Sequence, residues 1–112
     1  MTPAPLLVRA DTGPEIGIGH AMRCLAVAQA WRGRGAPCVL WAHAEALSGF
    51  ATRLRDEGIE TVHLEAARGS LDDARRVAEV AVARGAAWTL VDGYRFDAPY
   101  QEILAGAGPR SA

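Results

Sequence analysis

Short apolar runs alternate with longer helix-like segments along the whole of this chain of 112 residues. Four runs are rich in Val, Leu, Ile, Thr and Trp, and their length is typical of buried β-strands. They cover residues 6–11, 37–43, 59–64 and 88–92. The segments that follow them carry Ala and Leu at helical spacing, and they predict helices over 20–34, 45–57, 70–84 and 98–105.

Small and polar residues mark the ends of the predicted helices. Gly35 and Gly58 follow the first two helices, at a position where glycine commonly ends a helix. Ser70 can cap the third helix, and Asp72 and Asp73 lie in its first turn, beside the positive end of the helix dipole. These signals support the same boundaries as the apolar pattern.

The alternation of strand and helix predicts an α/β fold, with a Rossmann-like parallel sheet flanked by helices and joined by right-handed crossovers. The strand order expected for such a start is 3-2-1-4. Glu60 and His63 interrupt the apolar run of the third strand, as is typical of a strand at the edge of a sheet. The fourth strand would form the other edge, although it is apolar and exposed edges of that kind promote aggregation. We therefore expect residues 1–112 to be one domain cut before its fifth strand, or a sheet that another chain completes.

Composition narrows the classes of function. Half of the residues are hydrophobic, 22% are charged and the net charge is −1, which favours a globular domain without a basic face for nucleic acid. All 12 basic residues are Arg. The absence of Lys excludes a Schiff-base enzyme, a pyridoxal phosphate site and a Walker A loop.

The cysteines and the apolar runs of the chain indicate its cellular compartment. Cys24 and Cys38 lie in apolar stretches without CxxC spacing, as expected for buried thiols in a reducing compartment. The N-terminus does not resemble a signal peptide, and no apolar run is long enough to span a membrane. The expectation is a soluble, cytoplasmic protein without a membrane partner.

Two loops are expected to meet where the strand order reverses, between the first and fourth strands. Ligands of open parallel sheets bind at this point, outside the carboxyl ends of the strands. One loop spans residues 12–20 and the other spans 92–97. These loops form the predicted ligand site.

The first loop contains Gly17-Ile18-Gly19 directly before a helix. Such glycines let backbone N–H groups approach a ligand, and a helix N-terminus favours negative charge. The pattern is not a complete dinucleotide fingerprint, because Met22 stands at the third glycine position. A simple tight turn from strand to helix is the alternative interpretation.

His20 begins that helix and is the candidate general base. The positive end of the helix dipole disfavours the imidazolium form, so a neutral imidazole is expected near neutral pH. A neutral imidazole can take a proton from water. The alternative is a capping or packing histidine.

Arg23 interrupts a stretch, residues 21–30, that is otherwise apolar except for Gln29. A helix that is apolar nearly all round is expected to be buried, and a buried guanidinium needs a partner. Asp11 at the end of the first strand is the expected partner, and His20 lies one turn earlier on the same face. A purely structural pair that holds the loop is the alternative.

Asp92 and Tyr94 are expected to project from the end of the fourth strand. The Tyr94 hydroxyl can hydrogen-bond a substrate or orient the base, and packing on the loop is the alternative. Glu15 and Asp97 are expected to be solvated.

Two further histidines follow strands. His43 ends the second strand and can line the cleft, whereas His63 is expected on an exposed face of the sheet. A three-histidine metal site is conceivable from this placement but has little support in the sequence.

The segment from residue 9 to residue 31 resembles the N-terminal motif of the UDP-sugar hydrolases of pseudaminic acid biosynthesis and of the related spore-coat polysaccharide proteins. That motif is a strand ending in Arg-Ala/Ser-Asp, then Glu/Gln-Ile-Gly-x-Gly-His, then a helix with an arginine. The matching positions are Arg9, Asp11, Glu15, Gly17, Gly19, His20 and Arg23, and Asp92 and Tyr94 match a later Asp-x-Tyr segment. The likeness covers residues 6–35 and 88–100 in sequence and the remainder only in architecture. Gly-x-Gly-His alone also suggests other GT-B glycosyltransferases.

The resemblance implies a GT-B-like enzyme of two Rossmann-like domains, of which residues 1–112 form the N-terminal one. It implies hydrolysis of a UDP-linked diacetamido-trideoxy sugar to UDP and the free sugar, without a metal or another cofactor. His20 would activate the attacking water and Tyr94 would be an active-site tyrosine. The remaining expected substrate contacts are Asp11, Gly17, Ile18, Gly19, Arg23 and Asp92.

The chain departs from the family pattern after the fourth strand and helix. The second domain, which holds most of the uridine nucleotide in the family, has no counterpart in residues 1–112. Without that remote binding energy the chain alone is expected to be nearly inactive. Two other interpretations remain: the acceptor-binding N-terminal domain of a GT-B glycosyltransferase, and a non-enzymatic fragment whose open strand pairs with a partner.

Overall fold

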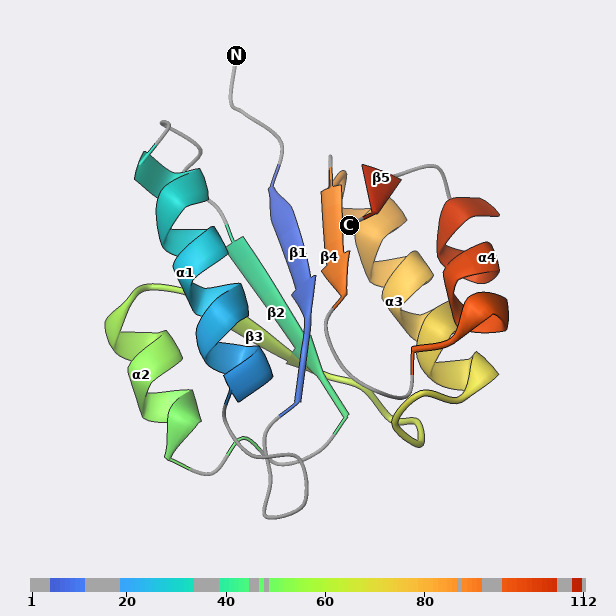
Figure 1. Ribbon diagram of the computed structural model, residues 1–112, viewed down its shortest axis with the longest axis horizontal. Helices are drawn as coiled ribbons and strands as arrows, with labels where there is room; N and C mark the ends of the chain where they lie inside the picture. Colours follow the sequence, from blue (N-terminus) through green and yellow to red (C-terminus); the bar gives the residue numbers. More distant parts are fainter. Residues whose placement is uncertain are drawn as a thin grey trace.

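A five-stranded parallel sheet forms the centre of the molecule (Figure 1). The computed structural model describes residues 5–11, 19–33, 39–44, 47, 49–86, 88–91 and 96–106, and the backbone of residues 110–111. The strands are β1 (Leu6–Arg9), β2 (Val39–His43), β3 (Glu60–His63), β4 (Trp88–Val91) and β5 (Arg110–Ser111), in the order β3-β2-β1-β4-β5. The predicted α/β class and the order 3-2-1-4 are confirmed.

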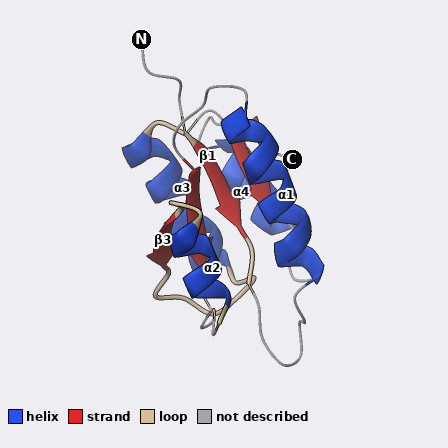
Figure 2. Cartoon of the chain, turned by 90° about the vertical axis from the view of Figure 1, so that its left-hand side faces the viewer, coloured by secondary structure: helices blue, strands red, loops and turns tan. Residues whose placement is uncertain are grey.

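Helices cover both faces of this sheet, as Figures 1 and 2 show. They are α1 (Gly19–Gly33), α2 (Phe50–Asp56), α3 (Leu71–Arg84) and α4 (Ala98–Gly106). The helices α1 and α2 pack on one face, and α3 and α4 pack on the other. This arrangement explains why β1 and β2 are continuous apolar runs, since both of their faces are buried.

Successive residues of the central strands enter two separate cores. In β1, Leu6 and Val8 pack beneath α1 and α2, whereas Leu7 packs beneath α3 and α4. Trp41 of β2 is fully buried in the first core, where its ring lies 5.4 Å from that of Phe50. Its indole N–H donates to the carbonyl of Ala10 at 3.0 Å, which satisfies the one polar group of a large buried side chain.

The outer edge of β4 is partly covered by the chain itself, so the expected open edge is a wrong prediction. Arg110 and Ser111 form β5 and pair with Trp88 and Thr89. A strand of two residues with polar side chains leaves no apolar periodicity in the sequence, because its backbone alone makes the pairing. The sequence analysis predicted no strand after residue 92, so β5 was missed.

The second helix is shorter than predicted. It begins at Phe50 rather than near residue 45, because Phe50 N donates to the carbonyl of Leu47 in a turn that precedes the helix. The third helix begins as expected, with the Ser70 hydroxyl accepting a hydrogen bond from the backbone N–H of Asp73 at 3.1 Å. Within the described residues, no helix combines the length and the apolar composition needed to cross a bilayer.

Candidate functional site

The carboxyl ends of the parallel strands lie at one edge of the sheet, where the predicted site falls. The structure describes the strand ends there and the first turns of the helices that follow. Residues 12–18 and 92–95 lie outside the described part of the chain. The predictions for Glu15, Gly17, Ile18, Asp92 and Tyr94 therefore remain predictions.

A fully buried guanidinium is the main feature of this edge. Arg9, the last residue of β1, donates from Nε to Asp73 Oδ1 at 2.9 Å and from Nη2 to Asp73 Oδ2 at 2.5 Å. Its Nη1 donates to Asp11 Oδ2 at 2.9 Å and to the carbonyl of Ala42 at 3.5 Å. The paired bonds to Asp73 are the bidentate geometry in which an arginine holds a carboxylate most strongly.

Two aromatic residues complete the environment of this ion pair. The Tyr100 hydroxyl donates to Asp73 Oδ1 at 2.6 Å, and Tyr100 is fully buried in the first turn of α4. The Phe96 ring lies 4.9 Å from the Arg9 guanidinium carbon and 4.9 Å from the Tyr100 ring. The backbone N–H of Gly69 donates to Asp73 Oδ2 at 2.8 Å, so both oxygens of this carboxylate accept more than one hydrogen bond. We refer to Arg9, Asp11, Asp73 and Tyr100 as the Arg9 network.

The surroundings shift the pKa values of Arg9 and Tyr100 upward. Burial alone would lower the pKa of Arg9, but the hydrogen bond and the charge of Asp73, with the charge of Asp11, hold this pKa above its ordinary value. Burial raises the pKa of Tyr100, and the hydrogen bond to Asp73 adds to that effect, whereas the Arg9 charge opposes it. At neutral pH the guanidinium is therefore charged and the phenol is protonated, as the donor geometry requires.

The network joins the segments that follow β1, β2, β3 and β4. The Asp11 side chain follows β1, and its Oδ1 accepts a hydrogen bond from the backbone N–H of Ala44, after β2, at 2.8 Å. Asp73 begins α3 after β3, and Tyr100 begins α4 after β4. Both carboxylate oxygens of Asp11 accept hydrogen bonds from the protein, so in this geometry Asp11 holds two loops in place.

His20 and Arg23 form a second polar group, one turn apart at the start of α1. Arg23 Nη2 donates to His20 Nδ1. A guanidinium can only donate, so the imidazole accepts at Nδ1 and, when neutral, carries its proton on Nε2. A Cβ placed on Gly19 would lie 4.0 Å from Arg23 Nη1, an ordinary van der Waals contact, so the packing here does not require glycine.

Two predictions about α1 are wrong. Arg23 is exposed, and the helix buries only one side, formed by Ala21, Cys24, Leu25 and Ala28. The buried arginine that holds Asp11 is Arg9. The small size of the alanines explains the error, because alanine is tolerated on an exposed helix face and does not by itself indicate burial.

The sequence analysis did not predict the ion pair of Arg9 with Asp73 or the hydrogen bond from Tyr100. It named Arg9 only as part of the family motif, and Asp73 only as a residue in the first turn of a helix. One signal was present. Arg9 interrupts a strand whose faces are both apolar, and a charge in such a strand requires a buried partner.

The two strand-end histidines lie next to each other. His43 of β2 is paired in register with His63 of β3, and their ring centres are 5.3 Å apart. His63 is exposed, as expected, and His43 is half-buried. In the part of the chain that the structure describes, no group of three or more metal-ligating side chains forms.

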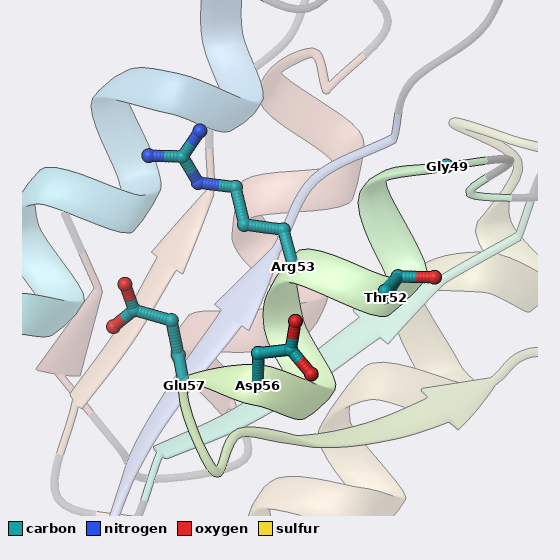
Figure 3. Close-up of a pocket in the computed structure, with 5 residues that line it drawn as sticks. All are labelled: Gly49, Thr52, Arg53, Asp56 and Glu57. Carbon is teal, nitrogen blue, oxygen red and sulfur yellow. The ribbon is translucent and has the colours of Figure 1, made fainter.

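A surface hollow of about 560 Å³ runs along α2 (Figure 3). It is lined by Gly49, Thr52, Arg53, Asp56 and Glu57. These residues belong to one short helix and its flanks, and they include none of the predicted site residues. The hollow has the mixed charge of an ordinary solvated surface.

Comparison with known proteins supports the fold and goes no further. No protein-family model matches the chain, and no curated protein matches it in sequence. The crystal structure of MurG from Acinetobacter baumannii, a GT-B glycosyltransferase, is similar, with a TM-score of 0.63 and 18% identity. The match covers 97% of this chain and 34% of the MurG chain. The chain thus has the α/β fold of one part of a GT-B protein and spans about a third of that protein's length.

Proposed function

We propose that this chain is the N-terminal, acceptor-binding domain of a GT-B enzyme that transfers a sugar from a UDP-sugar to an acceptor hydroxyl. The observation that supports this proposal is the structural match to MurG over nearly the whole chain. The sugar and the acceptor would meet at the carboxyl edge of the sheet, which is the usual ligand site of open parallel sheets. A second domain, or another chain, would hold most of the nucleotide.

His20 is the proposed base. It would take the proton of the attacking hydroxyl, whose oxygen then bonds to the anomeric carbon while UDP leaves with the electrons of the broken bond. In the described geometry Arg23 donates to His20 Nδ1. A donor diphosphate would attract Arg23 and release Nδ1 to accept the proton, so that substrate binding activates the base. Both residues of this proposed proton transfer, His20 and Arg23, belong to the family motif.

The remaining predicted residues keep their roles within the proposal. Gly17, Ile18 and Gly19 would present backbone N–H groups to the sugar or the diphosphate. Asp92 and Tyr94 would contact the sugar from the loop after β4. Asp11 would act through the loops that it holds, since its carboxylate is already hydrogen-bonded.

Hydrolysis of the UDP-sugar is the second candidate function. It is favoured by the motif from Arg9 to Arg23, which resembles that of the UDP-sugar hydrolases. The same base would then activate water, and no acceptor would be needed.

Product analysis separates the two functions. The longest reading frame that contains residues 1–112 would be incubated with UDP-sugars, with and without acceptor alcohols. Transfer predicts a glycosylated acceptor and little free sugar, whereas hydrolysis predicts free sugar in both mixtures. In either case His20→Ala is expected to lower turnover by at least ~100-fold. A loss of only a few fold would exclude His20 as the base.

A further inference from the structure

His43 and His63 are placed together by the pairing of two neighbouring strands. They stand opposite each other in the β2–β3 register, with ring centres 5.3 Å apart and ring planes inclined by 47°. Side chains alternate along a strand, and Trp41 and Ile59 enter the core beneath α1 and α2. Both histidines therefore lie on that same face, at the carboxyl edge of the sheet.

A hydrogen bond already fixes one of these imidazoles. His63 Nε2 lies 3.2 Å from the carbonyl oxygen of Ala44, and since a carbonyl only accepts, Nε2 carries the proton. The neutral ring then has its lone pair on Nδ1. Metal-ligating histidines almost always donate their second ring N–H in this way, to a backbone carbonyl or a carboxylate.

The residues around the pair are held firmly. Ala44, which accepts from His63, donates its own N–H to Asp11 of the Arg9 network at 2.8 Å. The backbone N–H of Leu64 donates to the carbonyl of His43 at 2.8 Å, which ties the two strand ends together. The backbones that carry the two rings are therefore held in place relative to each other by hydrogen bonds.

We propose that His43 and His63 form a two-histidine binding site for a divalent transition-metal ion such as Zn²⁺, Ni²⁺ or Cu²⁺. Two imidazoles that ligate one ion at nitrogen–metal distances near 2 Å have ring centres about 5 Å apart. The observed ring-centre separation of 5.3 Å is close to this distance.

The ligand type defines the class of ion. Imidazole nitrogen suits Zn²⁺, Ni²⁺ and Cu²⁺, whereas Mg²⁺ and Ca²⁺ take oxygen ligands. Within the described residues no third histidine, cysteine or carboxylate joins the pair. Water or a bound anion would fill the other positions, so the ion would exchange readily and His63, which is exposed, would give it access.

Calorimetric titration of the 112-residue chain with ZnCl₂ in a non-coordinating buffer tests the proposal. One ion is expected to bind per chain, and His43→Gln and His63→Gln are each expected to weaken binding by about tenfold or more. His20→Gln is the matched control and is expected to bind zinc like the parent chain. The proposal would be overturned if His43→Gln or His63→Gln bound zinc as tightly as the parent chain. It would also be overturned if His20→Gln weakened zinc binding as much as they do.

A second measurement needs no substitution. Substoichiometric Cu²⁺ broadens NMR signals near the ion, and the amides of residues 42–44 and 61–64 are expected to broaden first. Broadening that begins elsewhere would contradict the proposal. Neither experiment involves a sugar nucleotide, so its outcome is independent of the proposed enzymatic function.

Discussion

At the residue scale, the buried charge of Arg9 decides how the carboxyl edge is organised. Its guanidinium donates to two carboxylates and one carbonyl, and those partners come from segments that follow different strands. Removing a charge from water is costly, and an ion pair in the interior is tolerated only when its geometry and hydrogen bonds are good. We therefore expect the network to contribute chiefly by fixing these loops in one arrangement, since loss of a partner would leave a buried charge uncompensated.

Replacement of Arg9 by an apolar residue of similar length tests this role. Arg9→Met leaves Asp73 and Asp11 buried without their cation, and we expect a loss of about 3–5 kcal/mol in the free energy of unfolding. Arg75→Met is the control, since Arg75 and Asp72 form an exposed pair on α3 whose loss is expected to cost under about 1 kcal/mol. Urea denaturation of both variants measures the difference, and equal losses would show that the buried network has no special role.

The pH dependence of stability tests the Tyr100 hydroxyl. Its pKa is raised in the folded protein, so the native state keeps a proton that the unfolded chain releases above about pH 10. The Tyr100 hydroxyl therefore makes its whole contribution to the free energy of unfolding below about pH 10, and this contribution is lost as the pH rises further. Tyr100→Phe is expected to cost about 1–2 kcal/mol near neutral pH through loss of the hydrogen bond to Asp73.

The two proteins should become more alike as the pH rises, because only the parent chain has the Tyr100 proton to lose. Urea titrations at about pH 8 and about pH 11 would measure this convergence. A stability difference that stays constant between these pH values would contradict the interpretation.

At the scale of elements, local signals predicted most helices and strands, and failed where pairing or turns are set by the backbone. Ser70 caps α3 and Gly85 ends it in a left-handed conformation with φ of 66°, as capping chemistry predicts. The start of α2 was placed too early, because the helical spacing of Leu47, Phe50 and Leu54 was given more weight than Ser48-Gly49, a dipeptide common in turns. The strand β5 was missed because two residues have no periodicity.

Two helix-end glycines give a matched test of backbone conformation. Gly85→Ala places a Cβ in open space but in a left-handed conformation, so we expect a cost of about 1 kcal/mol from the backbone alone. Gly33→Ala, at the end of α1, also meets open space but without a positive φ, and it is expected to be neutral or stabilising by up to about 1 kcal/mol. Thermal unfolding of both variants provides the comparison, and effects of the same sign would refute it.

At the scale of the molecule, the sheet has one edge at β3 and another at β5. Exposed polar residues line β3, namely Glu60, Thr61 and His63, and Arg84 of α3 binds Glu60 through both guanidinium nitrogens at 2.7 and 2.9 Å. The hydrogen bond from Arg84 lowers the pKa of Glu60, so this edge keeps its negative charge. Charged residues at an edge oppose pairing with other chains.

Removal of β5 tests how the opposite edge is protected. A chain ending at Gly106 exposes the backbone of Trp88 and Thr89, and we expect it to form dimers or larger species at concentrations where the full chain does not. Full chains with Arg110→Ala or Ser111→Ala keep the backbone pairing and serve as controls. Size-exclusion chromatography with light scattering measures the masses, and identical profiles would show that β5 does not protect the edge.

The sequence by itself determined the α/β class and most element boundaries, because hydrophobic periodicity and capping are short-range properties. The order 3-2-1-4 followed from the usual topology of sheets with this alternation of strand and helix. The sequence also identified His20 at the start of α1 and Arg23 one turn later. The tertiary structure decided which arginine is buried and which histidines meet. Asp73 reaches Arg9 across 64 positions of sequence, and His63 meets His43 only through the register of β3 against β2. Such contacts depend on crossovers and strand register, which bring together residues that no local pattern relates.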